Sequence, residues 1–430
     1  MRGVIQLPRQ SETGNSNLRI QKDILVTHRK NIESRNSRAS LFLISALGLA
    51  VVADGSIAAS DRRPTPGVKI IDSVTWPSGY GPNHAAINTR TNRIYIANLA
   101  GGSVSVVDGK TDQIIDTIAV GDSTVGTPGY TGPAASAIDE KTNTIYTIND
   151  NGILSVIDGK TDKVTASFTV DTNNATFGLF TEDIVRSSKN GMLFASNYSN
   201  QIDVVDPGLK KVLAVIPDDN ANFLAINRRT NKIYAPQYWD ATVWVINGDS
   251  YQVEAVIDGV GDPAVPDECY LPNSPVPCSN PSSGLDRAAV DESTNRIYVA
   301  GVNDGSLFTI DGNTNKVVKH QTVAPGQFDV TVNPFTSTLY TINFATADLS
   351  VFNTRSSRLL DTISIGSGFT PAGCYVDQNT CTDFGNGPSS VAVNPLTGRI
   401  YVVDYGDVFS SAPNGTLKVL IAGRTEGDKR

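Results

Sequence analysis

Eight polar side chains recur at one place in a repeated pattern, and their types suit them to bind a charged group. They are Asn83, His84, Glu182, Asp183, Asn222, Asp286, Arg287 and Asp329. The aspartates would pair with a positively charged group of an oriented polar ligand or with a hydrated metal. The imidazole of His84 or the guanidinium of Arg287 would bind an anionic group. The alternative is a water-filled channel in which these charges only pair with one another.

An aromatic residue that returns seven times gives these side chains their common position. The seven are Tyr95, Tyr146, Phe194, Tyr234, Tyr298, Tyr340 and Tyr401. Counting eleven residues back from each gives His84, Ala135, Asp183, Phe223, Arg287, Asp329 and Ser390, and the preceding residues are Asn83, Ala134, Glu182, Asn222, Asp286, Phe328 and Ser389. Most other positions of the repeat keep one residue class. The variation at this pair of positions is what an oriented polar ligand would require.

The repeat itself predicts a sheet of four antiparallel strands. In residues 92–121, runs rich in Val, Ile, Thr and Tyr alternate with turns such as Asp108-Gly109-Lys110-Thr111. This composition is typical of β-hairpins rather than helices. A short run at 84–88 supplies the first strand, where the polar residues described above lie.

The two ends of the repeat region predict that the sheets close into a ring. Six repeats carry a fourth strand, whereas the seventh stops soon after Ile421, and the segment VKIIDSVTW at 68–76 resembles the missing strand. An open solenoid does not need such a permuted strand, and a closed ring protects the sheet edges. We therefore predict an all-β fold, a seven-bladed β-propeller over residues 61–430 that an N-terminal strand closes. The first strands of the blades would surround its axis.

The second strands read IYIAN, IYTIN, IYAPQ, IYVAG, LYTIN and IYVVD. At these repeats the sequence resembles the YVTN β-propeller repeat family, over nearly all of the chain that follows the first 60 residues. The resemblance implies the propeller fold, and such propellers serve as surface-layer, binding and cofactor-enzyme modules. Related seven-bladed folds include lactonases and quinone-dependent dehydrogenases, but no motif in this sequence matches their catalytic residues.

The first 60 residues predict a leader. Residues 1–38 are polar and basic, and the apolar run ASLFLISALGLAVVA at 39–53 fits a signal-peptide core better than the roughly 20 residues that span a bilayer. We expect an exported protein, periplasmic, cell-surface or secreted, without a transmembrane segment in the mature chain; an uncleaved membrane anchor is the alternative. Residues 1–60 carry a net charge of +4 within the total of −8. Residues 61–430 therefore carry a negative net charge, which disfavours nonspecific nucleic-acid binding.

Four long insertions, at 121–132, 171–180, 259–284 and 366–387, each join a fourth strand to the next first strand. Topology therefore places them on the same face of the ring, the loop-rich face. The four cysteines lie in two of them, and we expect disulfides between Cys269 and Cys278 and between Cys374 and Cys381, since an exported chain enters an oxidising compartment. Zinc is the competing prediction, but CxxC spacing is absent and neither pair has a histidine nearby in sequence.

These observations favour a monomeric binding protein that recognises a small molecule, a glycan or a protein partner on its loop-rich face. The alternative is an enzyme, a lactonase-like hydrolase or a quinone-cofactor dehydrogenase. It would use the carboxylates that surround the axis of the ring, which we call the funnel. No GxSxG elbow presents a serine to His84. The sequence names no cofactor, and a divalent metal is the candidate that the funnel carboxylates suit.

Overall fold

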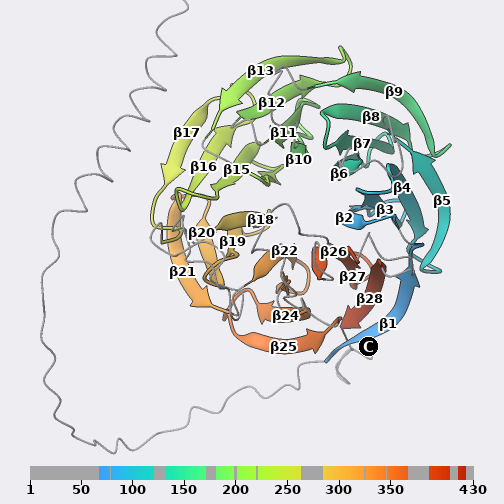
Figure 1. The fold of residues 1–430 in the computed structure, drawn as a ribbon. Helices are drawn as coiled ribbons and strands as arrows, with labels where there is room; N and C mark the ends of the chain where they lie inside the picture. Colours follow the sequence, from blue (N-terminus) through green and yellow to red (C-terminus); the bar gives the residue numbers. More distant parts are fainter. Residues whose placement is uncertain are drawn as a thin grey trace, which may run out of the picture. The chain divides into compact units, whose positions relative to one another are not determined.

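The computed structural model describes seven β-sheets arranged in a ring (Figure 1). The described residues are 67–77, 79–120, 132–170, 181–197, 201–218, 221–262, 284–323, 326–344, 346–366, 387–406 and 415–422. The chain divides into Met1–Arg62 and Arg63–Arg430. The predicted signal segment, both cysteine pairs and most of the four insertions lie outside the described residues. Within the described ranges, no helix has the length and apolar character needed to cross a membrane.

Each of the first six blades contains four consecutive antiparallel strands, paired in chain order. Blades 1 to 3 comprise β2 (Pro82–Asn88), β3 (Arg93–Asn98), β4 (Ser103–Asp108) and β5 (Gln113–Ala119); β6 (Pro133–Asp139), β7 (Thr144–Asn149), β8 (Ile153–Asp158) and β9 (Lys163–Thr169); and β10 (Thr181–Arg186), β11 (Leu193–Asn197), β12 (Gln201–Asp206) and β13 (Lys211–Pro217). Blades 4 to 6 comprise β14 (Ala225–Asn227), β15 (Lys232–Gln237), β16 (Thr242–Asn247) and β17 (Val253–Ile257); β18 (Leu285–Asp291), β19 (Arg296–Gly301), β20 (Ser306–Asp311) and β21 (Lys316–Thr322); and β22 (Gln327–Asn333), β23 (Thr338–Asn343), β24 (Asp348–Asn353) and β25 (Leu359–Ser364). The first strand of each blade lies nearest the axis and the fourth lies on the outside (Figure 1).

The seventh blade joins the two ends of the repeat region, as the sequence predicts. It contains β26 (Pro388–Asn394), β27 (Arg399–Asp404), β28 (Thr416–Ala422) and, as its outer strand, β1 (Val68–Thr75). β1 runs antiparallel to β28, with Val68 opposite Ala422. Trp76 follows β1, and its buried indole N–H donates to Ser105 Oγ of blade 1 (2.9 Å). The seven-bladed all-β fold and its closure by an N-terminal strand are thus confirmed.

The core lies between the blades and is built around the seven repeated aromatic residues, all of which are buried. Tyr401 of blade 7 packs in one cluster with Trp76 and with Ile94 of blade 1. Tyr95 of blade 1 likewise packs with Ile145 and Ile157 of blade 2. Each second strand therefore contributes its aromatic ring to the contact with a neighbouring blade, which explains why this position keeps its residue class.

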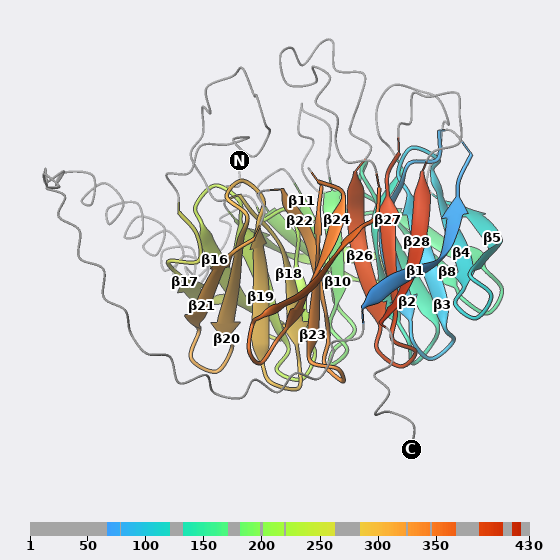
Figure 2. The same ribbon diagram turned by 90° about the horizontal axis from the view of Figure 1, so that it is seen from below.

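The turns that follow the first and third strands of each blade lie on the face of the ring opposite the loop-rich face. We call it the turn face (Figure 2). Asn92, before β3, has a positive φ of 52°, a conformation that Asn adopts more readily than most residues. Its Oδ1 lies 2.6 Å from where a Cβ on Gly109 would stand, so the Asp-Gly turn after β4 needs glycine at this close approach. Asn92 also accepts a hydrogen bond from Asn394 Nδ2 (2.8 Å), which joins blade 7 to blade 1.

Candidate ligand-binding site

The predicted polar residues lie at irregularities of the innermost strands. Where β2 and β10 pair with the second strands of their blades, the register skips Asn83 and Glu182 respectively. In β18 it skips both Asp286 and Arg287, and in blade 4 Asn222 precedes the start of β14. A bulge bends its strand and re-aims side chains. Asn83, Glu182, Asp286 and Arg287 are therefore not constrained by the sheet ladder, whereas His84, Asp183 and Asp329 are paired in it.

Arg287 is the cation of this site and is 5% exposed. Its Nη1 lies 3.6 Å from Asp329 Oδ2 in the next blade. Its guanidinium lies over the ring of Phe223, 3.7 Å from the centroid, and 5.2 Å from the centroid of Phe328. A guanidinium held over an aromatic face and paired with a carboxylate is stabilised in this position. Arg287 is thus engaged by neighbouring protein groups, although its Nε has no hydrogen-bond partner among the described residues.

Carboxylates outnumber this cation. Burial, followed by repulsion from Asp286, raises the pKa of Glu182 to about 8, with Arg287 acting in the opposite direction. Burial raises the pKa of Asp286 to about 7, opposed first by Arg287 and then by the hydrogen bond from Asn222 Nδ2 (3.3 Å). Glu182 keeps some accessible surface, whereas Asp286 is 3% exposed. Near neutral pH Glu182 is therefore mostly protonated and Asp286 partly so, and a positively charged group would displace these protons.

Two of the predicted aspartates also join neighbouring blades. Asp183 Oδ2 accepts a hydrogen bond from the N–H of Leu224 (2.9 Å), and burial still raises the Asp183 pKa to about 6. Asp329 Oδ2 accepts from the N–H of Val391 in blade 7 (2.8 Å), and burial raises its pKa against the effect of Arg287. These carboxylates have a structural role besides their charge.

Asn83 and His84 of β2 are the residues that blade 1 contributes to this site. Asn83 Nδ2 donates to the carbonyl oxygen of Ala134 in blade 2 (3.2 Å), and its own carbonyl accepts from Ser389 Oγ (2.8 Å). His84 keeps some accessible surface, but the surrounding protein atoms and then Arg287 lower its pKa to about 3. Its imidazole is therefore neutral at physiological pH, and within the described part of the chain its Nδ1 has no hydrogen-bond partner.

Asp150, in the turn between β7 and β8, belongs to this group and is absent from the sequence prediction. It is 6% exposed, and burial followed by the charge of Glu182 raises its pKa to about 8. The signal for it was available in the repeats. Four residues after the aligned aromatic, Asp150 stands where the other repeats have Leu99, Tyr198, Tyr238, Val302, Phe344 and Tyr405.

The described part of the site does not form a metal centre. Across the described ranges, no three His, Cys, Asp or Glu side chains converge closely enough to hold a metal ion. The described residues place several buried acids around the guanidinium of Arg287, which is already paired with Asp329. This arrangement suits the recognition of a charged organic group.

Comparisons with known proteins do not add a family or an activity. No protein-family model matches the chain, and no curated protein matches it. What stands established is a seven-bladed, all-β propeller with a ring of buried ionisable residues around its axis.

Proposed function

We propose that this chain is a binding protein whose axial site receives a positively charged group, such as an ammonium, of a polar ligand. The observation that carries the proposal is the excess of acid over base around the axis. The carboxyl groups are those of Asp150, Glu182, Asp183, Asp286 and Asp329, and the cation among them, Arg287, is already paired with Asp329. A ligand ammonium would replace the protons of these acids and leave their charges compensated.

The geometry supports a cation better than an anion as the recognised group. Arg287 lies over Phe223 and beside Asp329, so an incoming anion would compete with a carboxylate that is already in place. The lowered pKa of His84 removes the second positive charge that an anion would need. The carboxyl and amide groups of the ring also offer oxygens that accept hydrogen bonds from an ammonium.

The loop-rich face is the proposed entrance. The ring residues lie at or just before the starts of the first strands, where Glu182, Asp183, Asp286 and Arg287 follow two of the insertions in sequence. Asp150 lies in a turn that joins a second to a third strand. In an antiparallel blade both kinds of connection fall on the same face. An amine can belong to a small molecule, an amino sugar of a glycan or a lysine of a protein, so this chemistry covers all three predicted partner classes.

The proposal includes export and the resemblance to the YVTN repeats. The apolar segment at 39–53 supports passage through a membrane, and the tyrosine-containing second strands support the repeat family. In an oxidising compartment Cys269 would pair with Cys278, and Cys374 with Cys381. These bonds would hold two insertions of the face through which the ligand enters.

Calorimetric titration of the purified full chain with cadaverine, a diamine, and with glutarate, a dianion of similar length, tests this function. We expect cadaverine to bind and glutarate not to bind. Replacing Glu182 by Gln together with Asp286 by Asn should weaken cadaverine binding at least about tenfold, which corresponds to about 1.4 kcal/mol. Asp116→Asn, on the exposed face of β5, is the matched control and should leave binding unchanged. Preferential binding of glutarate, or cadaverine binding that survives the double substitution, would contradict the proposal.

A further inference from the structure

The turn face carries one exposed side chain per blade at an equivalent place, five residues before the repeated aromatic residue of the second strand. We call these seven residues the tip residues. They are Arg90, Lys141, Lys189, Arg229, Ser293, Phe335 and Leu396. The N–H of Arg90 donates to Asn88 Oδ1 (3.1 Å), and that of Phe335 donates to Asn333 Oδ1 in the same way (3.1 Å). At these two positions the turn uses the backbone of the tip residue rather than its side chain.

The tip residues are sorted by chemical type around the ring. Blades 1 to 4 carry the cations, blade 5 carries Ser293, and blades 6 and 7 carry Phe335 and Leu396. These two side chains are 70% and 64% exposed, more than any other large hydrophobic residue among those described. Because the turn does not need an apolar side chain here, the fold gives no reason for the two most exposed ones to be neighbours.

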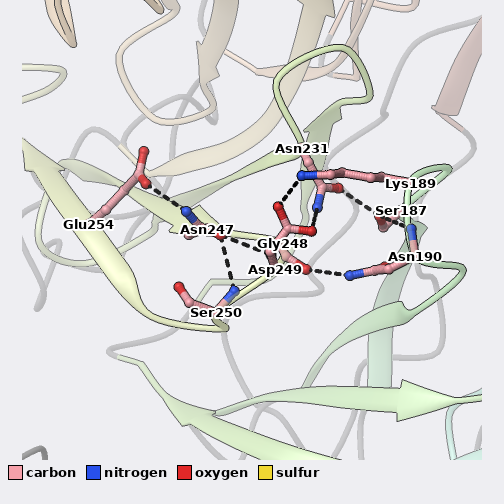
Figure 3. A network of polar contacts seen from close by, with 9 residues as sticks. All are labelled: Ser187, Lys189, Asn190, Asn231, Asn247, Gly248, Asp249, Ser250 and Glu254. Carbon is pink, nitrogen blue, oxygen red and sulfur yellow. Dashed lines mark hydrogen bonds and ion pairs between the residues drawn. The ribbon is translucent and has the colours of Figure 1, made fainter.

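Several acids of the turn face are engaged in its hydrogen bonds. Glu140 Oε1 accepts from both the N–H and the hydroxyl of Thr89 (2.8 Å each). Asp249 pairs with Lys189 and also accepts from Asn231 Nδ2 (3.0 Å), which Figure 3 shows. In the described part of the chain, Arg90 and Lys141 have no ion-pair partner. The four cationic tip residues, Arg90, Lys141, Lys189 and Arg229, form the cationic arc. Through Arg90 and Lys141 this arc keeps positive charge that an external partner can bind.

Neighbouring turns are also held together, so the tip residues act as one surface. Asn88 Nδ2 donates to Asn143 Oδ1 between blades 1 and 2 (2.7 Å), and Asn227 Nδ2 donates to Asn295 Oδ1 between blades 4 and 5 (2.7 Å). Asn190 Nδ2 reaches the carbonyl oxygen of Gly248 between blades 3 and 4 (2.7 Å; Figure 3). Together with the bond from Asn394 Nδ2 to Asn92 Oδ1, which joins blade 7 to blade 1, these contacts hold neighbouring turns of the face together.

We infer that the turn face docks on an anionic lipid bilayer, with Phe335 and Leu396 entering the interfacial region and the cationic tip residues contacting lipid headgroups. Exposed apolar side chains beside Lys and Arg are the combination that binds such surfaces. Phe335 and Leu396 lie on turns with most of their side chains exposed, which suits insertion into a soft interface. The acidic charge of the rest of the propeller would turn the turn face toward the bilayer. The axial site would then open away from the membrane.

Co-sedimentation of the full chain with vesicles of phosphatidylcholine containing 30 mol% phosphatidylglycerol tests this inference. The double variant Phe335→Ser/Leu396→Ser should lose at least about tenfold in vesicle affinity. The matched control is Ile71→Ser/Val318→Ser, which removes exposed apolar side chains of the outer strands β1 and β21 and should stay within about twofold of the parent chain. Arg90→Gln/Lys141→Gln should lose only the part of the binding that salt also removes. Any contribution from the apolar segment at 39–53 is common to all these variants and does not affect the comparison.

A tryptophan at the tip reports insertion directly. With brominated lipid in the vesicles, Phe335→Trp should gain a blue-shifted, quenched emission relative to the parent chain, whereas Ile71→Trp should not. Equal vesicle binding by the parent chain and the Phe335→Ser/Leu396→Ser variant, together with unquenched emission from the tryptophan introduced by Phe335→Trp, would overturn the inference. Binding of soluble polyglutamate that depends on Arg90 and Lys141, without any effect of these residues on vesicle binding, would also overturn it and would indicate an acidic protein partner instead.

Discussion

The carboxylate of Asp183 accepts a hydrogen bond from the backbone N–H of Leu224, which lies in the neighbouring blade (2.9 Å). A residue chosen from the sequence as a charge partner for a ligand therefore also ties blade 3 to blade 4. The same double role applies to Asp329, which contacts both Arg287 and the N–H of Val391. At these two positions, structural and ligand-binding effects must be separated by experiment.

Asp183→Ala should lower the free energy of unfolding by about 1 to 3 kcal/mol, because it leaves the buried N–H of Leu224 without an acceptor. Asp183→Asn keeps an oxygen at this place and should cost less than the alanine. Denaturant titration followed by circular dichroism measures both, with the exposed Asp116→Ala expected to stay within about 0.5 kcal/mol of the parent chain. Equal effects of Asp183→Ala and Asp116→Ala would show that the contact between the blades adds nothing to stability.

The stability of the propeller should fall as the pH rises from about 5 to 8. Burial raises the pKa of Glu182 to about 8 and that of Asp286 to about 7, so in this range the folded chain holds protons that the unfolded chain has already lost. Stability declines as these protons dissociate. His84 acts in the opposite sense, since its lowered pKa favours the folded state as the pH rises, but only up to about 6.5, where the unfolded histidine loses its proton.

Glu182→Gln isolates one of these groups, because glutamine resembles the protonated acid at every pH. The variant should match the parent chain near pH 4.5 and become the more stable of the two above it, with a gap that widens by about 1 to 2 kcal/mol between pH 5 and 8. Urea unfolding at a series of pH values measures the gap. If it does not change with pH, the Glu182 carboxyl group is not held in its protonated form.

The closure of the ring should depend on Trp76. Its side chain is 1% exposed and bridges the outer strand of blade 7 to Ser105 in blade 1. Trp76→Ala should destabilise the chain by about 3 to 5 kcal/mol, and Trp76→Phe should recover most of the packing but not the hydrogen bond. Trp239, which is 37% exposed, is the matched control. Thermal unfolding in which Trp76→Ala behaves like Trp239→Ala would show that this contact does not stabilise the closed ring.

The fold could be predicted from the sequence because its information is local and repeated. Tyr95 and its six equivalents pack at the same contact between blades. The Asp-Gly turns have glycine where a residue such as Asn92 comes too close for a Cβ. The permuted segment 68–76 then predicts closure, since β28 would otherwise have an unpaired edge.

The site could be predicted only in part. Counting along the repeats locates Glu182, Asp286 and Arg287 at the axis, but spacing does not show which charges face one another. The pairing of Arg287 with Asp329 is a contact between blades, and the bulge that takes Asp286 and Arg287 out of the ladder of blade 5 is not visible in the spacing. Asp150 was missed because it lies on a turn after the second strand, although its charge differs from every equivalent residue.

The measurement that tests the ammonium site most directly is the proton release that accompanies binding. Calorimetric titration of the full chain with cadaverine at pH 7.5, in phosphate and in Tris, separates the heat of binding from the heat of buffer protonation. Because Glu182 and Asp150 each have a pKa raised to about 8, we predict that binding releases protons, and that Glu182→Gln reduces the number released. Binding heats that are the same in the two buffers would contradict the account.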